Sequence, residues 1–191
     1  MRLHGTISPE LPLLVVALEE EAVHLGTHGL PILVTGAGKV NAAVATAMTL
    51  GNHSPSQVVN LGTAGALVDG INGIHVISAV TQHDLNDDAL FDLTGLHFGP
   101  PIVLEGTGPV LTTGDQFIAD PLTRQQLSQY AQLVDMEGYA IAKAAMTANI
   151  PVMLVKQVSD SADNSAARSW RDTVDYCAEQ LGAWVMKHLN R

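Results

Sequence analysis

Residues 151–163 read "PVMLVKQVSDSAD", an apolar and β-branched run that ends at two acids, Asp160 and Asp163. We expect Val152–Val158 to form a buried strand, because aliphatic and β-branched residues in a short run favour strands. The acids at its end have two interpretations. An Asx-type turn explains them without any function, and a carboxyl group held at the edge of a sheet explains them as part of a site.

Apolar runs of the same kind recur along the chain and alternate with segments of helical spacing. Strands are expected at 11–18, 31–35, 57–61, 74–81, 110–112 and 133–136, and helices within 36–51, 121–130, 137–149 and 170–189. In the first helix the apolar residues Val40, Val44, Ala47 and Met48 recur at helical spacing, and Asp120 is a plausible N-cap for the second. Residues 84–108 are rich in Gly, Asp and Pro and are expected to be mostly irregular. The alternation predicts an α/β sheet with helices on both faces.

Composition narrows the class of partner. The chain has 191 residues, a net charge of −10 and only 9 Lys and Arg residues. Such a chain repels a phosphate backbone, so we expect no nucleic-acid partner. No apolar stretch approaches the roughly 20 residues of a membrane span, so we expect no membrane partner and a cytoplasmic location. The single cysteine, Cys177, allows no internal disulfide, and the eight histidines show no zinc-type spacing, so no metal is expected.

Polar residues gather where the expected strands end, which is where ligands sit in such sheets. They are Glu19–Glu21, "GTAG" at 62–65, "DMEG" at 135–138 and "SDSAD" at 159–163. Each also has an ordinary interpretation, as helix N-terminal charge, a packing turn, a helix cap or an Asx turn. Backbone N–H groups of "GAGKV" at 36–40 could hold an anion or a sugar hydroxyl. A period of two would point Asp135 and Glu137 to one face and Met136 to the other.

Six segments in order carry a family resemblance: "VALEEEAVHL", "TGAGKVNAAVATAM", "VVNLGTAGAL", "TTGDQFI", "VDMEGYAIAKAA" and "PVMLVKQVSDSADN". Together they resemble the nucleoside phosphorylase/nucleosidase superfamily, nearest to its 5′-methylthioadenosine/S-adenosylhomocysteine nucleosidases. The resemblance implies a three-layer α/β fold with a central mixed sheet flanked by helices. It also implies one domain over residues 1–191, with loops shorter than those of the family, and cleavage of the N-ribosidic bond of a purine nucleoside without a cofactor.

The resemblance also assigns roles. Glu21 would position and deprotonate the attacking water, Glu137 would bind the ribose hydroxyls, and Asp160 would protonate purine N7. Met136 would pack on the sugar, Phe117 would stack on the purine, and the backbone of Ile118 would read the adenine edge. Ser159 would orient Asp160, and Trp170 would lie over the 5′ substituent. The remaining expected substrate-binding residues are Thr63, Ala64, Gly65 and Asp135.

This chain departs from the family pattern at several positions. Lys156 stands where the family often has arginine, Asp135 where it has glutamate, and "GTAGAL" replaces a serine-containing turn. The segment before "TTGDQFI" is short and is expected to lack a helix, which removes material that elsewhere helps to build the dimer and the 5′ pocket. We still expect a homodimer, in which a neighbouring subunit helps to wall the 5′ end, as in relatives.

Three alternatives to adenine-nucleoside hydrolysis stay open. Phosphorolysis is disfavoured, because Glu19, Glu20 and Glu21 would repel the phosphate that relatives hold with arginines near the first strand. Another hydrolase of the superfamily, acting on a futalosine-like compound, is the second alternative. The third is a non-catalytic nucleoside-binding domain on the same scaffold, since a fold does not imply a function.

Overall fold

The computed structural model describes residues 1–26, 29–164 and 166–189 of the chain. Within them, ten strands form one mixed sheet in the order β1-β3-β2-β4-β9-β8-β6-β7, with β10 pairing β4 and β5. The strands are β1 (Arg2–His4), β2 (Leu13–Val16), β3 (Ile32–Val34), β4 (Val58–Ala66), β5 (Ile74–Val76), β6 (Ala79–Gln82), β7 (Ile102–Val103), β8 (Val110–Thr113), β9 (Leu133–Asp135) and β10 (Val152–Asp160).

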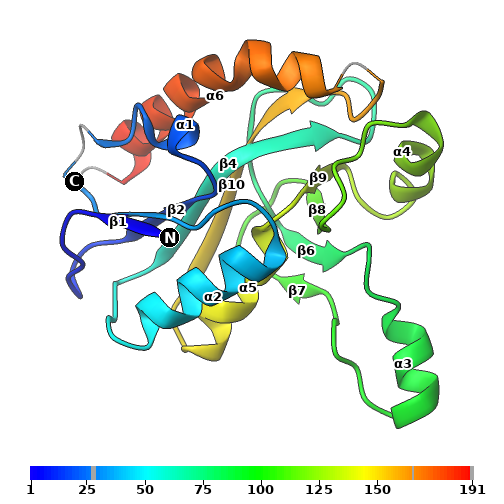
Figure 1. Ribbon diagram of the computed structural model, residues 1–191, viewed down its shortest axis with the longest axis horizontal. Coiled ribbons are helices and arrows are strands. Elements are labelled where there is room, and N and C mark those ends of the chain that lie inside the picture. The colour runs from blue at the N-terminus through cyan, green and yellow to red at the C-terminus, as the bar shows by residue number, and fades with distance from the viewer. Residues whose placement is uncertain (27–28, 165, 190–191) are drawn as a thin grey trace.

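Helices cover both faces of this sheet (Figure 1). They are α1 (Glu19–Ala22), α2 (Lys39–Leu50), α3 (Asp87–Thr94), α4 (Pro121–Leu127), α5 (Gly138–Thr147) and α6 (Ala166–His188). In the view of Figure 1, α1 and α6 lie above the sheet, and α2 and α5 lie side by side below it. The predicted α/β fold, with a central mixed sheet flanked by helices, is confirmed. No described helix is long and apolar enough to cross a membrane.

The core follows the two-residue period of the strands. Leu14 and Val16 of β2 pack in the cluster that contains Leu181 and Val185 of α6. Their neighbours Leu13 and Val15 pack on the opposite face, with residues of α2 and α5. Alternate side chains of one strand therefore fill two separate cores, which is why these strands read as continuous apolar runs.

The pair β4 and β10 lies at the centre of the sheet and is parallel from Val58↔Val152 to Ala64↔Val158. The register then shifts, so that Asp160 pairs Gly65. Strand β4 extends through Ala66 instead of ending at Leu61 as predicted, so the small residues of "GTAGA" belong to the strand. Strand β10 therefore places Asp160 beside the small residues of β4.

Two predicted elements differ in the structure. Residues 84–108 were expected to be irregular and to lack a helix, but they contain α3 and β7. The side chain of Asn86 caps α3 by accepting from Ala89 N, and Gly95 ends it in the left-handed conformation with φ 70°. The single strand expected at 74–81 is two strands, β5 and β6, which pair different neighbours.

The helix α2 buries a different face from the one its apolar spacing suggested. Val40 is 71% exposed, Val44 52% and Met48 57%. The buried positions are Ala42, Ala45, Thr46, Thr49 and Leu50. Most of these buried residues are small because α2 packs closely against α5, and the three larger apolar side chains named above are left on the surface.

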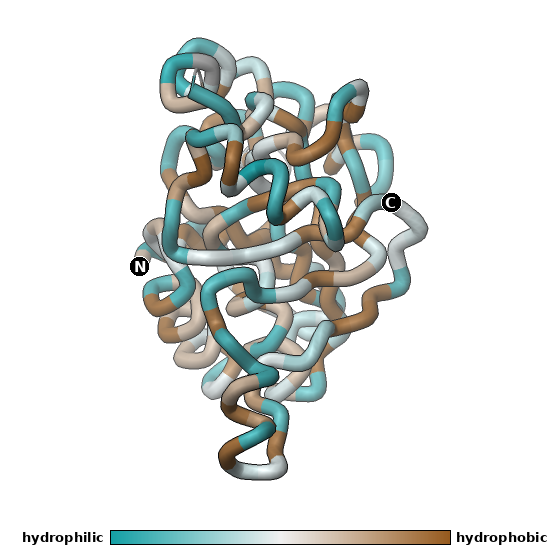
Figure 2. Tube along the Cα trace, turned by 90° about the vertical axis from the view of Figure 1, so that its right-hand side faces the viewer, coloured by the Kyte–Doolittle hydropathy of each residue, from teal (hydrophilic) through white to brown (hydrophobic). Residues whose placement is uncertain are grey.

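A projecting arm, residues 84–103, carries α3 away from the body of the molecule (Figure 1). Figure 2 shows the arm at the bottom, with hydrophobic segments along it. Large apolar side chains of the arm are exposed, among them Phe91, Leu93, Leu96, Phe98 and Val103. The arm therefore presents apolar surface that the described part of the chain does not cover.

Candidate active site

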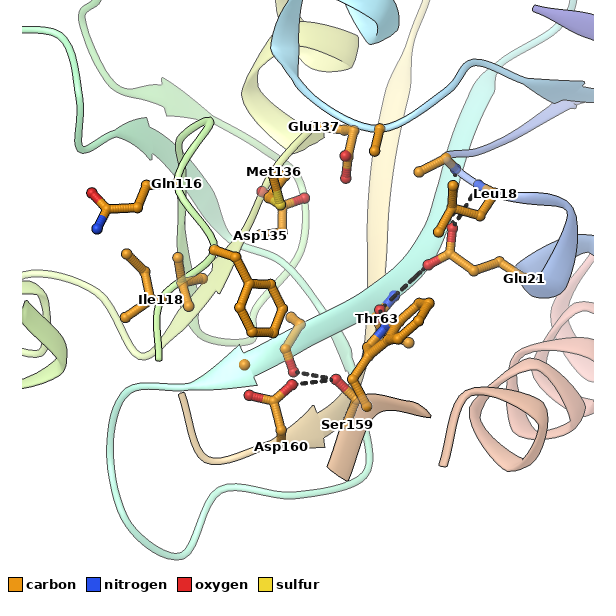
Figure 3. A pocket seen from close by; sticks show the side chains of 17 residues that line it. Leu18, Glu21, Thr63, Gln116, Ile118, Asp135, Met136, Glu137, Ser159 and Asp160 are labelled. Carbon is orange, nitrogen blue, oxygen red and sulfur yellow. Dashed lines mark hydrogen bonds between the residues drawn. The ribbon is translucent and has the colours of Figure 1, made fainter. Parts of the chain in front are cut away.

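One pocket, which we call the acid pocket, lies where β4, β9 and β10 end (Figure 3). All twelve residues expected to form the site line it: Glu21, Thr63, Ala64, Gly65, Phe117, Ile118, Asp135, Met136, Glu137, Ser159, Asp160 and Trp170. Five further residues complete the lining: Ala17, Leu18, Ala37, Gln116 and Val134. Positions separated by up to 153 residues in the chain thus meet in one cavity of about 230 Å³.

Glu21 is held from two sides. Its Oε2 accepts hydrogen bonds from the backbone N–H of Ala17 at 3.0 Å and of Leu18 at 3.2 Å. Its Oε1 accepts from the backbone N–H of Thr63 at 3.0 Å. Glu21 is 5% exposed, whereas Glu19 lies outside the pocket and pairs with Arg2 at 2.8 Å. Of the three consecutive glutamates at 19–21, only Glu21 therefore lines the pocket.

Glu137 binds the glycine turn that precedes α2. It occupies the N-cap position of α5 but makes no side-chain capping bond, and its Oε1 accepts from Gly38 N at 2.7 Å. Gly38 has φ 90°, a conformation that glycine adopts without strain. The group that this turn holds is therefore a side-chain carboxyl of the same chain. Burial, and next the charge of Asp135, raises the pKa of Glu137 to about 8.

The junction between β9 and α5 does not keep the simple alternation that the sequence suggested. The strand ends at Asp135, and Glu137 has φ −137° and ψ −27°. Met136 consequently lines the same pocket as the two acids instead of facing away from them.

A buried ion pair lies behind the acid pocket. Lys156 Nζ is 2.9 Å from Asp135 Oδ2, and the two side chains are 2% and 1% exposed. Burial by itself lowers the pKa of Lys156, but the charges of Asp135 and Glu137 outweigh it and raise that pKa. Asp135 also accepts from Thr113 Oγ1 at 2.6 Å and from Gly138 N at 2.8 Å. These partners satisfy a carboxylate that would otherwise be costly to bury.

Gly62 lets this ion pair and Glu21 approach each other. A Cβ atom there would lie 3.1 Å from Glu21 Oε1 and 3.4 Å from Lys156 Nζ. Because Gly62 has no side chain, the ammonium group of Lys156 and the carboxylate of Glu21 can both lie close to β4 at this position.

Asp160 satisfies both interpretations of the opening run. Its Oδ1 accepts from Ala162 N at 2.8 Å, which is the Asx-type bond of a turn. Its Oδ2 accepts from Ser159 Oγ at 2.7 Å, and the carboxyl group lines the acid pocket. Burial raises the pKa of Asp160, against the two hydrogen bonds, which lower it. A carboxyl group of this kind holds its proton at a higher pH than an exposed aspartate does.

Apolar side chains form the rest of the wall. Phe117 is 45% exposed at the pocket, and Ile118 beside it is 4% exposed. Trp170 comes from the first turns of α6, and its Nε1 donates to Thr63 Oγ1 at 3.0 Å. Ring and aliphatic surfaces with a few convergent polar groups are typical of sites for small organic ligands.

The pocket is poor in positive charge. Among its described lining residues there are four acids and no Lys, Arg or His. The N–H of Gly38 already donates to Glu137, and that of Lys39 donates to Asp115 Oδ1 at 2.7 Å. The donors that could have formed an anion site at the glycine turn are therefore occupied by carboxylates.

Some functional contacts were not expected from the sequence. The N–H groups of Ala17 and Leu18 hold Glu21, and Gln116 joins the wall beside Phe117. Gln116 had a signal, since it lies within the quoted "TTGDQFI" segment. The two N–H groups had none, because a backbone donor carries no mark in the sequence.

Comparisons with known proteins agree with this architecture. The profile of the phosphorylase superfamily matches residues 10–110 and 106–189. A 5′-methylthioadenosine/S-adenosylhomocysteine nucleosidase of Shewanella sediminis is 27% identical over 198 residues, covering 85% of this chain and 86% of the relative. One of Staphylococcus aureus is 27% identical over 175 residues, covering 77% and 75%.

Two solved structures from Helicobacter pylori share the fold. A mutant nucleosidase with 5′-methylthioadenosine in its active site has a TM-score of 0.83 at 21% identity, covering 93% of this chain and 97% of that one. A futalosine hydrolase mutant has a TM-score of 0.81 at 20% identity, covering 92% and 96%. Because the family profile spans nearly all of the sheet, its helices and the acid pocket, the chain belongs to the phosphorylase superfamily.

Proposed function

We propose that this chain is an N-ribosyl hydrolase that cleaves the glycosidic bond of an adenine nucleoside, such as 5′-methylthioadenosine or S-adenosylhomocysteine, and releases free adenine. The observation that carries the proposal is that three carboxyl groups with different partners, those of Glu21, Glu137 and Asp160, line one pocket. The two sequence relatives described above are named as nucleosidases for these compounds, which supports the same activity.

Each carboxyl group has surroundings that suit one task. Glycosidic cleavage develops positive charge on the sugar, which nearby carboxylates stabilise. Glu21 accepts bonds on both oxygens and would orient the attacking water. Asp160 has a raised pKa and would donate a proton to N7 as adenine leaves. Glu137 would bind the ribose hydroxyls.

Water is the proposed nucleophile rather than phosphate. The pocket offers a phosphate ion no basic side chain among its described lining residues, and a Glu21 carboxylate in it would repel the ion. We therefore expect 5′-methylthioadenosine to yield adenine and free 5-methylthioribose in phosphate-free buffer. A strict requirement for phosphate, with a sugar 1-phosphate as product, would show that the chain is a phosphorylase.

The identity of the 5′ group is best tested by a chromatographic screen. Thioether nucleosides, adenosine and futalosine would be incubated with the protein, with and without phosphate, and free base would be measured. Preferred cleavage of a thioether nucleoside supports the proposal, and preferred cleavage of futalosine favours the second hydrolase. Binding of a nucleoside without release of base from any of them would identify a non-catalytic binding domain.

A homodimer is the proposed assembly. The helix α2 and the arm both lie in the lower part of the view in Figure 1, and Val40 of α2 and Leu93 of the arm are 71% and 83% exposed. Apolar patches of this kind mark interaction surfaces, and we propose a second copy of this chain as the occupant. The single domain and the cytoplasmic location expected from the sequence stay predictions.

A further inference from the structure

Trp170 links α6 to the centre of the sheet. It lies in the second turn of α6, and its indole N–H reaches Thr63 on β4, 107 positions earlier in the chain. A second anchor follows three residues later, where Thr173 Oγ1 donates to Ser159 O at 3.2 Å. The ring of Trp170 is therefore held in a defined direction at the pocket wall.

Thr63 connects this ring to Glu21. The N–H of Thr63 donates to Glu21 Oε1 at 3.0 Å, and its hydroxyl oxygen lies 3.4 Å from the same carboxylate oxygen. Figure 3 shows Thr63 beside the Glu21 carboxylate, with a dashed line between them. Thr63 thus contacts Glu21 through both its backbone and its side chain.

The chemistry of the three groups sets the direction of each hydrogen. An indole N–H is a donor only, so Thr63 Oγ1 must accept from Trp170. A threonine hydroxyl has one proton of its own, which is free to rotate unless its surroundings select a direction. With one lone pair committed to Trp170, the hydroxyl proton is directed to the acceptor nearby, which is Glu21 Oε1.

We propose that Trp170 is a positioning residue for Glu21, acting through the hydroxyl of Thr63. The proposal rests on the proposed function, in which Glu21 orients the attacking water. The chain of hydrogen bonds from Trp170 to Thr63 to Glu21 fixes Oε1 from the β4 side, while Ala17 and Leu18 fix Oε2 from the other side. A carboxylate held on both oxygens keeps the water in line with the sugar carbon, and alignment of this kind contributes to rate more than to binding.

Two substitutions separate this role from simple packing. Trp170→Phe keeps an aromatic ring at the wall and removes the N–H. Thr63→Val keeps the shape and the backbone N–H and removes the hydroxyl. We expect Thr63→Val, which removes a hydrogen bond to a charged group, to lower kcat for adenine release about 10- to 150-fold. Trp170→Phe removes a hydrogen bond between neutral groups and should lower kcat about 3- to 10-fold, and both variants should change KM by less than about threefold.

The double variant Trp170→Phe/Thr63→Val is the decisive measurement. If the two residues act through one series of hydrogen bonds, the double variant loses about as much kcat as the worse single variant, because the second change removes nothing more.

Thr63→Ser restores the hydroxyl and is expected to have a higher kcat than Thr63→Val. Trp184→Phe is the matched control, since Trp184 lies on α6 outside the pocket and stacks on His188; its kcat is expected to be unchanged.

Three results would overturn the positioning role: kcat of Trp170→Phe within twofold of the unmodified chain, multiplicative losses in the double variant, or an effect confined to KM. Melting temperatures of all variants identify any loss that comes from unfolding. If the unmodified chain releases adenine but one of these results holds, the positioning role fails alone. If the unmodified chain releases no adenine from any nucleoside, the proposed function fails, and the positioning role fails with it.

Discussion

Folded proteins usually bury apolar side chains and expose charged ones. The acid pocket does the opposite by burying charged groups, and the apolar arm does the opposite by exposing apolar side chains. In the pocket, Glu21, Asp135 and Glu137 are all less than a tenth exposed, and so is Lys156 behind it. On the arm, Leu93 and Val103 are more than four-fifths exposed. Buried charge and exposed apolar surface are each costly to a free monomer. We infer that both are kept because something else occupies them: a nucleoside in the pocket and a second copy on the arm.

Replacing Asp160 by Asn gives the largest expected effect in the pocket. Asn can still accept from Ala162 N and bond to Ser159, so the turn survives. The titratable proton is lost, so kcat for adenine release should fall about 10²–10⁴-fold, or roughly 3–5 kcal/mol, with KM changed much less. Steady-state kinetics and melting temperature measure the two consequences separately.

Asp163→Asn is the matched control for that change. Asp163 does not line the pocket, and its charge is one contribution to the raised pKa of Asp160. A small change in kcat is therefore expected. If Asp163→Asn proves more damaging than Asp160→Asn while both variants stay folded, the assignment of Asp160 as the acid is wrong.

Lys156→Met tests how much the buried charges depend on each other. The substitution leaves Asp135 buried without its ion-pair partner, so we expect a loss of about 3–5 kcal/mol in the free energy of unfolding. Denaturant titration measures it. Asp135→Asn/Lys156→Met removes both charges and should recover part of the loss. Equal stability of the single and double variants would mean that the pair contributes little.

Leu93→Asp tests the arm. A charged side chain in an interface between two copies should raise the dissociation constant of the dimer at least about tenfold, because a buried unpaired charge is strongly unfavourable. Light scattering across a dilution series would detect the monomer. Leu122→Asp is the matched control, since Leu122 is 73% exposed on α4, away from the arm. A monomeric unmodified chain at micromolar concentration would contradict the proposed dimer.

Glu137→Gln gives the smallest expected effect, which depends on pH. The folded chain holds the Glu137 proton up to a pKa of about 8, whereas the unfolded chain releases it at the ordinary lower value. The contribution of this proton to the free energy of unfolding is therefore complete at pH values below the ordinary pKa of a glutamate, and it is lost as the pH rises through 8. The Gln variant should therefore match the unmodified chain at pH 4 and melt a few degrees higher at pH 8.5. An equal difference at both pH values would contradict the raised pKa.

Much of the fold could be predicted from local patterns. The apolar runs of β2, β3 and β10 indicated strands, and Asp120 was identified as the cap of α4, where its side chain accepts from Thr123 N. β1 was missed because "RLH" is an exposed edge strand with no apolar signal. The Gly, Asp and Pro content of residues 84–108 predicts irregular structure, so it does not indicate α3, although Asn86 and Gly95 mark the ends of this helix.

Local sequence patterns specify the α/β class, the order of the motifs and the acids at the strand ends, since these depend on residues close together in the chain. The tertiary fold sets the partners of those acids. Gly38 bonds Glu137 across 99 positions, and Trp170 bonds Thr63 across 107. It also decided that α2 turns its small residues inward and leaves Val40 and Met48 outside. The physical reason is the same in each case: burial and hydrogen-bond partners are set by neighbouring strands and helices, which local spacing does not specify.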